Sequence, residues 1–122
     1  MEVHTILGNG FQEVVYQRAL SIEMEIQNIK HQREFEMPLF YKGIDVGKRR
    51  VDFLIANELS VEIKALVSLE PVHLAQAKNY LEAYNLPTGL LLNFGAKSLQ
   101  FKRLFNKKYN QNPVNPQILS IL

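Results

Sequence analysis

Residues 49–65 read RRVDFLIANELSVEIKA, which is the pattern of two β-strands joined by a short turn. Alternation along the first strand predicts two faces. One face carries Val51, Phe53 and Ile55, and the other carries Arg50, Asp52 and Leu54. The second strand alternates Val61 and Ile63 with Glu62 and Lys64. Because Asn57 and Glu58 supply polar residues between the two strands, we predict a β-hairpin here.

The register of this hairpin determines whether its acidic residues can act together. Glu62 and Lys64 share one face of their strand, where charged groups are costly unless they pair or bind a metal. A two-residue turn would set Asp52 opposite Ile63 and place the two acids on opposite faces. A three-residue loop or a bulge would bring Asp52 to the Glu62 face instead. A shared metal site requires this second register, and we therefore predict a three-residue loop or a bulge near Asn57 and Glu58.

The composition excludes several classes of site. The chain has 122 residues, enough for one domain with a single core, and no cysteine. Disulfides, thiolate catalysis and cysteine-based zinc sites are therefore excluded. The 14 basic and 12 acidic residues give a net charge of only +2, which is compatible with a nucleic-acid partner but does not argue for one. No apolar run approaches the roughly 20 residues of a membrane span, and no signal peptide opens the chain, so we expect a cytoplasmic protein without membrane contact.

The remaining segments predict an α/β fold. Apolar residues recur with helical spacing from Phe11 to about residue 30, and a second helix is expected from Pro71 to about Tyr84. Strands are expected at 34–41, in both halves of the hairpin, at 89–94 and at 99–105. The order α-β-β-β-α-β-β predicts a three-layer α/β sandwich with a central mixed sheet. We assign residues 1–105 to this domain and residues 106–122 to a C-terminal extension.

Each predicted helix has an apolar stripe with polar residues beside it. The first helix is expected to bury Phe11, Val14, Val15, Ala19, Ile22, Ile26 and Ile29, and one edge of this face carries Glu13, Tyr16, Gln17 and Leu20. The second helix is expected to bury Leu74, Ala77, Leu81 and Tyr84, and a separate polar stripe carries His73, Gln76 and Tyr80. Tyrosines at the edge of a core usually have hydrogen-bonded hydroxyls, which is what we expect of Tyr16 and Tyr80.

Four motifs occur in order along these elements. Residues 10–16 read GFQEVVY, which is G-x-x-E-x-x-Y, and the hairpin carries Asp52 followed by Glu62-Ile63-Lys64. The second helix contains QAKNY at 76–80, and LNFG follows at 92–95. With these motifs the chain resembles the GxxExxY family, a branch of the PD-(D/E)XK nuclease superfamily, over roughly residues 3–105. An isolated D…E-x-K often occurs by chance, but four motifs in the right order rarely do.

The resemblance implies a restriction-endonuclease-like core and a set of site residues. By matching positions, Asp52 and Glu62 are the metal carboxylates and Lys64 is the lysine of the motif. Glu13 is the acid carried by the first helix and a third candidate metal ligand, and Gln76 is the accessory residue of the second helix. Val51 stands where the superfamily name has a proline, a position that is only weakly diagnostic.

The chemistry of phosphodiester cleavage suits these residue types. Cleavage needs a hard cation that neutralises charge on the phosphate and lowers the pKa of a bound water. Mg²⁺, or Mn²⁺ in its place, accepts one or two carboxylates and keeps several waters, which matches Asp52 and Glu62. Lys64 lies on the Glu62 face, where it can orient the attacking water or stabilise developing charge. The candidates for phosphate or nucleic-acid contact are Arg50, Lys48, Gln76 and Tyr80.

Three functions remain open. The first is a metal-dependent nuclease that hydrolyses nucleic acid, with DNA as the favoured substrate and a homodimer or another partner supplying specificity. The second is a nucleic-acid-binding module that keeps the fold but does not cleave, and the third is a structural subunit. The full set of Asp52, Glu62 and Lys64 favours the first function, whereas a first helix that faces away from Asp52, with Glu13 in solvent, would favour the third. Each of these residues also has a simpler explanation. Glu62 and Lys64 would form a solvated strand face, and Glu13 would be a favourable first-turn acid. The basic residues of 97–108 would be ordinary solubility charges.

Overall fold

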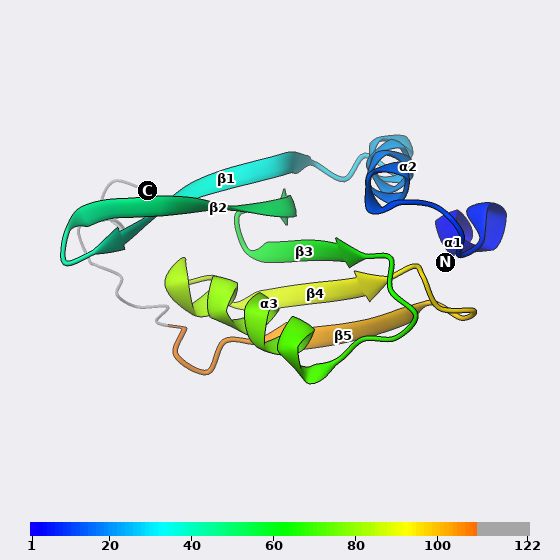
Figure 1. Ribbon diagram of the computed structural model, residues 1–122. Helices are drawn as coiled ribbons and strands as arrows, with labels where there is room; N and C mark the ends of the chain where they lie inside the picture. The colour runs from blue at the N-terminus through cyan, green and yellow to red at the C-terminus, as the bar shows by residue number, and fades with distance from the viewer. Residues whose placement is uncertain (110–122) are drawn as a thin grey trace.

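The computed structural model describes residues 1–109, in which three helices and five strands follow one another (Figure 1). The order is α1 (Glu2–Leu7), α2 (Glu13–Ile26), β1 (His31–Tyr41), β2 (Ile44–Ile55), β3 (Leu59–Lys64), α3 (Pro71–Ala83), β4 (Thr88–Asn93) and β5 (Gln100–Phe105). All the predicted elements are present, and α1 is an addition to them. Within the described residues, no helix is long and apolar enough to cross a membrane. The greater part of the predicted C-terminal extension, residues 110–122, lies outside the described chain.

The five strands form one mixed sheet in the order β1-β2-β3-β4-β5. β3 and β4 are parallel, and the other neighbouring pairs are antiparallel. Because parallel neighbours need a crossover connection, α3 links β3 to β4 across one face of the sheet. The predicted α/β sandwich with a central mixed sheet is confirmed.

Two apolar clusters, one on each face of the sheet, hold the layers together. The cluster beneath α1 and α2 consists of Val3, Tyr16, Met24, Phe53, Val61, Ile63, Leu92 and Phe94. The cluster beneath α3 consists of Val51, Leu54, Tyr80, Leu81 and Leu86. Burying apolar area of this kind is the main favourable contribution to folding, so the helices are fixed on the sheet by these two clusters.

The β2–β3 hairpin has the register that a shared acidic site requires. Ile55 is opposite Leu59 and Phe53 is opposite Val61, which leaves a three-residue loop at residues 56–58. The prediction of a three-residue loop is confirmed. The pairing of the two strands ends at Phe53 and Val61, so Asp52 and Glu62 lie just beyond it and are not paired across the hairpin.

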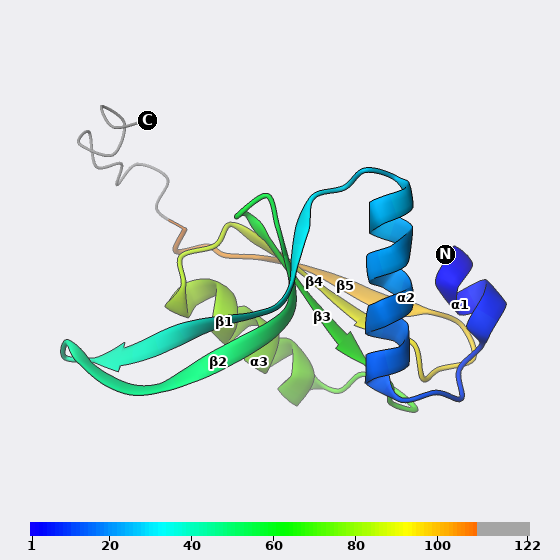
Figure 2. The ribbon, with the colours of Figure 1, turned by 90° about the horizontal axis from the view of Figure 1, so that it is seen from above.

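The long β1–β2 hairpin, which reaches well beyond the rest of the sheet in Figure 2, is irregular at Glu34. The register of this hairpin shifts between Leu39 and Phe40. It is the same on both sides of Glu34, Arg33–Phe53 and Phe35–Val51, but Glu34 between them has a φ of 55° and is not paired with Asp52. The side-chain alternation of β2 breaks at this point, because Phe53 packs under α2 while Val51 packs under α3. The prediction that these two residues share a face is therefore wrong.

The buried face of α2 is also different from the predicted stripe. Its buried residues are Tyr16, Gln17, Ser21 and Met24, which follow the edge of the stripe, whereas Ile22 and Ile26 are exposed. In α3, Ala77 and Leu81 are buried as predicted, but Tyr80 from the expected polar stripe is buried with them. Polar side chains from both helices are thus directed into the protein, where the sheet carries its charged residues.

Asn93, the second residue of the LNFG motif, fixes the chain where it leaves β3. Its side-chain oxygen accepts hydrogen bonds from the backbone N–H of Leu66 at 2.8 Å and of Gly95 at 3.1 Å. Its side-chain nitrogen donates to the Leu66 carbonyl at 2.9 Å and to Gln100 Oε1 at 2.9 Å. Asn93 is fully buried, so these bonds satisfy backbone groups that water does not reach. The motif therefore has a structural role in holding the end of the strand that carries Glu62 and Lys64.

Candidate active site

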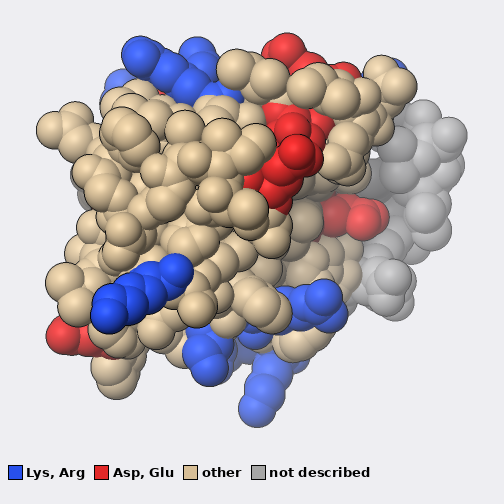
Figure 3. All heavy atoms as spheres, turned by 90° about the vertical axis from the view of Figure 1, so that its right-hand side faces the viewer, with Lys and Arg blue, Asp and Glu red and all other residues tan. Residues whose placement is uncertain are grey.

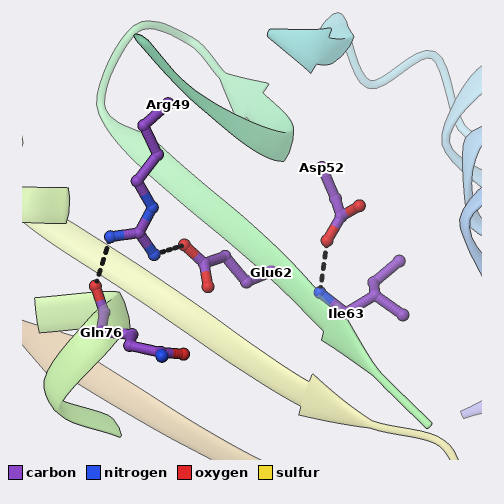
Figure 4. Close-up of polar contacts among 5 residues, drawn as sticks. All are labelled: Arg49, Asp52, Glu62, Ile63 and Gln76. Atoms are coloured by element: carbon purple, nitrogen blue, oxygen red, sulfur yellow. Dashed lines mark hydrogen bonds and ion pairs between the residues drawn. The ribbon is translucent and has the colours of Figure 1, made fainter. Parts of the chain in front are cut away.

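The candidate site lies where β2 and β3 diverge beyond the Phe53–Val61 pair. Here the backbone N–H of Ile63 donates a hydrogen bond to Asp52 Oδ2 at 2.7 Å, so a side chain replaces the missing strand partner (Figure 4). A buried N–H group needs such a partner. The bond fixes the Asp52 carboxylate next to the backbone of the residue that follows Glu62.

Gln17 on α2 holds the other oxygen of Asp52. Its Nε2 donates to Asp52 Oδ1 at 2.8 Å. Gln17 is buried, and its Oε1 has no hydrogen-bond partner within the described residues. Helix α2 therefore faces Asp52 and presents an unpaired oxygen beside it, which is a feature that sequence reasoning missed.

Glu62 is a buried carboxylate on the α3 side of β3. Only 8% of the residue is exposed, and its Oε1 accepts a hydrogen bond from Arg49 Nη2 at 3.1 Å. Burial raises the pKa of the Glu62 carboxyl above its usual value, while the charges of Arg49 and Lys64 hold the rise back and that of Asp52 adds to it. The carboxylates of the two acids have different partners: Asp52 bonds to Gln17 and to the Ile63 N–H, and Glu62 bonds to Arg49.

Arg49 connects Glu62 to α3. Its Nη1 donates to the backbone carbonyl of Gln76 at 3.0 Å, and its guanidinium lies 5.5 Å from the centre of the Tyr80 ring (Figure 4). Sequence reasoning proposed Arg50 and Lys48 instead, but the structure pairs these exposed residues with acids of β1. Arg50 lies 3.8 Å from Glu34, and Lys48 lies 3.1 Å from Glu36.

The other predicted residues lie around this pair of acids. Lys64 ends β3, and its backbone carbonyl accepts a hydrogen bond from the Phe94 N–H at 2.8 Å. Glu13 is the first residue of α2, exposed and one helical turn before Gln17. Gln76 contributes its backbone carbonyl, and its side chain is on an exposed residue of α3. The structure thus places Asp52 and Glu62 on neighbouring strands with different hydrogen-bond partners, and Glu13 lies one turn before Gln17 on α2.

Residues 1–104 match the sequence profile of a protein family described as the PD-(D/E)XK nuclease superfamily. The chain belongs to this superfamily. Its structure is also similar to a solved structure, the crystal structure of SSO0001, with a TM-score of 0.61 and 20% sequence identity. That likeness covers 77% of this chain and 50% of the other, so the chain matches half the length of that protein, and at this identity it shows the fold alone. No curated protein matches the sequence.

PD-(D/E)XK proteins usually use divalent metal ions, and the donor atoms of this structure can be compared with that requirement. Residues 1–109 contain no cluster of three or more His, Asp or Glu side chains, so Glu13 does not join Asp52 and Glu62 in one. Two coupled carboxylates nevertheless suit Mg²⁺, which takes one or two carboxylates and keeps several waters. The unpaired Oε1 of Gln17 is a further hard oxygen beside Asp52. Two carboxylates and one amide oxygen are therefore the hard donor atoms that this part of the chain could offer a cation.

The tyrosine of the GxxExxY motif has a structural role. The Tyr16 hydroxyl donates to the Gly8 carbonyl at 2.6 Å and accepts from the Phe11 N–H at 3.1 Å. Its ring stacks on Phe94, with ring centres 4.6 Å apart. The prediction of a hydrogen-bonded hydroxyl is confirmed for Tyr16, which ties the loop before α2 to the helix that carries Glu13 and Gln17.

The same prediction is wrong for Tyr80, and this gives a first test. The Tyr80 hydroxyl is buried without a partner in the described residues, and burial, followed by the nearby Tyr84 and Glu62, raises its pKa to about 12. Because an unpaired buried hydroxyl is destabilising, Tyr80→Phe should raise the free energy of unfolding by about 1 kcal/mol. Urea unfolding measures this change. As a control, Tyr84→Phe should lower it by about 1 kcal/mol, since the Tyr84 hydroxyl donates to the Met37 carbonyl at 3.0 Å. A loss of stability in Tyr80→Phe would contradict the assignment.

Basic side chains do not mark a continuous nucleic-acid track on the end of the molecule shown in Figure 3. On that face the lysine and arginine side chains lie in separate groups around the edge, and most of the surface between them is uncharged. A phosphate backbone is usually bound by basic groups that follow its path. The local arrangement at Asp52 and Glu62 therefore carries the functional argument.

Proposed function

We propose that this chain is a metal-dependent nuclease that hydrolyses phosphodiester bonds in nucleic acid, and that it belongs to the GxxExxY branch of its superfamily. The observation that carries the proposal is the position of Asp52, whose carboxylate is bound to the backbone N–H of Ile63, the residue after the buried Glu62. Glu62 is a buried acid and Asp52 is fixed nearby by a buried glutamine, an arrangement that is costly for the fold, and a cation between the two acids would offset that cost. Tyr16 and the LNFG motif support the branch assignment by fixing the elements that carry these residues.

The residues then have the following roles. Bound Mg²⁺ or Mn²⁺ would neutralise charge on the phosphate and lower the pKa of a water. Asp52 and Glu62 would hold this cation, and Gln17 keeps the Asp52 carboxylate in position. Lys64 orients the attacking water or stabilises developing charge, and Glu13 acts as an outer acid that accepts a hydrogen bond from water. Gln76 supports Arg49 from α3.

The substrate and the assembly are finer parts of the same proposal. We propose DNA as the substrate, with the exposed residues Arg50 and Lys48 contacting phosphates through the β1–β2 hairpin. Specific DNA recognition typically buries about 1,000 Å² or more of protein surface. That is a large share of the surface of a domain of this size. A homodimer would supply it. A cytoplasmic location stays a prediction.

A non-catalytic nucleic-acid-binding module is the second candidate. The ion pair between Arg49 and Glu62 favours it, because this pair already satisfies the carboxylate that a metal would use. The structural subunit has less support. Glu13 is exposed, as that function would require, but α2 faces Asp52 through Gln17.

Titration calorimetry with Mn²⁺ and Mg²⁺ tests the proposal. Wild type should bind one divalent ion per chain, and Asp52→Ala should lose that binding, since one of two carboxylates is removed. Glu25→Ala, which removes an exposed acid from the far end of α2, should bind as wild type does. Wild type and Asp52→Ala are then assayed on single- and double-stranded DNA and RNA. Heat without cleavage would support the non-catalytic module, and no heat in wild type, even with an oligonucleotide present, would exclude the metal-dependent nuclease.

A further inference from the structure

Arg49 contacts a carboxylate, a backbone carbonyl and an aromatic ring. Only the carboxylate, that of Glu62, belongs to the pair of candidate site acids, Asp52 and Glu62. Arg49 Nη2 lies 3.1 Å from Glu62 Oε1. Its Nη1 donates to the Gln76 carbonyl at 3.0 Å, and the guanidinium lies over the Tyr80 ring. The Arg49 side chain is 30% exposed, so it is reachable from solvent while its head group is fixed. Removing one of these contacts would leave the other two in place.

A cation at Glu62 would compete with Arg49. Two positive groups that share one buried carboxylate repel each other, and the partly exposed Arg49 is the one that can turn away. The Gln76 carbonyl and the Tyr80 ring would still hold the guanidinium next to the site, with Nη2 lacking an acceptor. An arginine fork with free N–H groups is well suited to a phosphate oxygen.

We propose that Arg49 is a phosphate-binding residue. Glu62 keeps its guanidinium occupied until a metal ion binds Glu62 in place of Arg49. In the metal-free protein, Arg49 is the counter-ion of Glu62. In the metal-bound protein, the same guanidinium donates to a phosphate oxygen of the nucleic acid, so metal binding and substrate binding strengthen each other. This inference rests on the proposed function, and it reconciles the Arg49–Glu62 ion pair with catalysis.

Arg50 provides the matched comparison. It is the next residue along β2, but it lies 3.8 Å from Glu34 in an ion pair whose side chains are both largely exposed, 58% and 42%. Such a pair contributes little and opens easily. A phosphate contact by Arg50 would therefore be available with or without metal, whereas a contact by Arg49 would depend on it.

Fluorescence anisotropy with a labelled DNA oligonucleotide, in EDTA and in Ca²⁺, tests the coupling without cleavage. In EDTA, Arg49→Gln should bind the oligonucleotide as wild type does, to within about twofold, because Arg49 is occupied by Glu62. In Ca²⁺ it should bind about tenfold more weakly than wild type, the effect of one lost charged hydrogen bond. Arg50→Gln should weaken binding by the same factor in both buffers. An equal effect of Arg49→Gln in both buffers, or none in either, would overturn the proposal.

Metal binding alone supplies the second measurement. Without DNA, Arg49→Gln should bind Mn²⁺ several-fold more tightly than wild type in calorimetry, because the competing cation has gone. Arg49→Lys keeps the charge but cannot bridge Glu62 and the Gln76 carbonyl as a planar fork does, so its Mn²⁺ affinity should lie between the two. Weaker Mn²⁺ binding in Arg49→Gln, with thermal unfolding unchanged, would overturn the proposal. A wild type that binds no metal would instead refute the proposed function itself.

Discussion

Replacing Glu62 with glutamine is expected to remove divalent-metal binding while raising the free energy of unfolding by about 1 kcal/mol at pH 7. Burial raises the pKa of the Glu62 carboxyl, which means that the folded protein tolerates the charged form less well than the unfolded chain does. Glutamine has the same shape and can keep an oxygen toward Arg49 Nη2, but it carries no charge to desolvate. The variant should therefore be more stable, and under the proposed function it should lose nuclease activity along with one of the two proposed metal ligands.

The pH dependence of this gain follows from the direction of the pKa shift. Below the usual carboxyl pKa of 4.5, Glu62 is neutral in both the folded and the unfolded chain, and wild type and variant should be equally stable with respect to this group. As the pH rises through the raised pKa, only wild type acquires a buried charge and loses stability. The difference in melting temperature between Glu62→Gln and wild type should thus appear above pH 4.5 and reach roughly 4 °C at pH 7.

Asp52→Asn is the control, because it should abolish metal binding but change stability in the opposite direction. Both Asp52 oxygens accept hydrogen bonds, at 2.8 Å from Gln17 and at 2.7 Å from the Ile63 N–H. An asparagine would present its NH₂ group to one of these donors and cost about 1 to 3 kcal/mol. Thermal unfolding and Mn²⁺ calorimetry on both variants measure the two effects. If Glu62→Gln were less stable than wild type at pH 7, the charge of Glu62 would be favourable in the fold, contrary to this account.

The hairpin could be predicted from the sequence because its signals are local. The three-residue loop is observed, as the sequence predicts. The shared face that it was expected to give is not, because Asp52 bonds to Gln17 of α2 while Glu62 pairs with Arg49 on the α3 side. The helix at Pro71 and the buried run before Phe94 were also readable from short-range patterns. By contrast, α1 has six residues, too few to show a helical period, and it is held by Val3 in the cluster beneath α2.

The contacts of the site could not be predicted, because they depend on irregular backbone and on tertiary packing. Strict alternation along β2 pointed to Arg50, but the irregularity at Glu34 places Val51 on the α3 side, and Arg49, two residues before it, reaches Glu62 there. The predicted apolar stripe of α2 left Gln17 at its edge, whereas the structure buries it. The sequence places Gln17 beside Tyr16 and one turn after Glu13. No local pattern shows that its buried amide faces an aspartate on the sheet.

Gly95→Ala is expected to destabilise the protein by about 3 kcal/mol or more, the second large effect that we predict. A Cβ at this position would lie 2.4 Å from both the N and the O of Leu66 and 2.5 Å from the carbonyl carbon of Ala65. These are backbone atoms of the segment that follows β3, and Asn93 already holds that segment through the Leu66 N–H and carbonyl. The backbone has no rotamer with which to relieve the contact, so either the end of β3 or the turn at Gly95 must move.

Gly10→Ala is the matched control for this steric argument. A Cβ at Gly10 would meet no atom within 4 Å, and neither Gly10 nor Gly95 has a positive φ, so alanine is compatible with both backbones apart from the contact at Gly95. Gly10→Ala should change the free energy of unfolding by no more than about 0.5 kcal/mol, even though Gly10 opens the GxxExxY motif.

Thermal unfolding should show Gly95→Ala melting roughly 10 °C or more below wild type. Because the displaced segment begins at Lys64, Gly95→Ala should also weaken Mn²⁺ binding at a temperature where it is still folded. Equal melting temperatures for the two variants would mean that the turn after Phe94 can move freely away from β3, and the LNFG motif would then have no part in positioning the site.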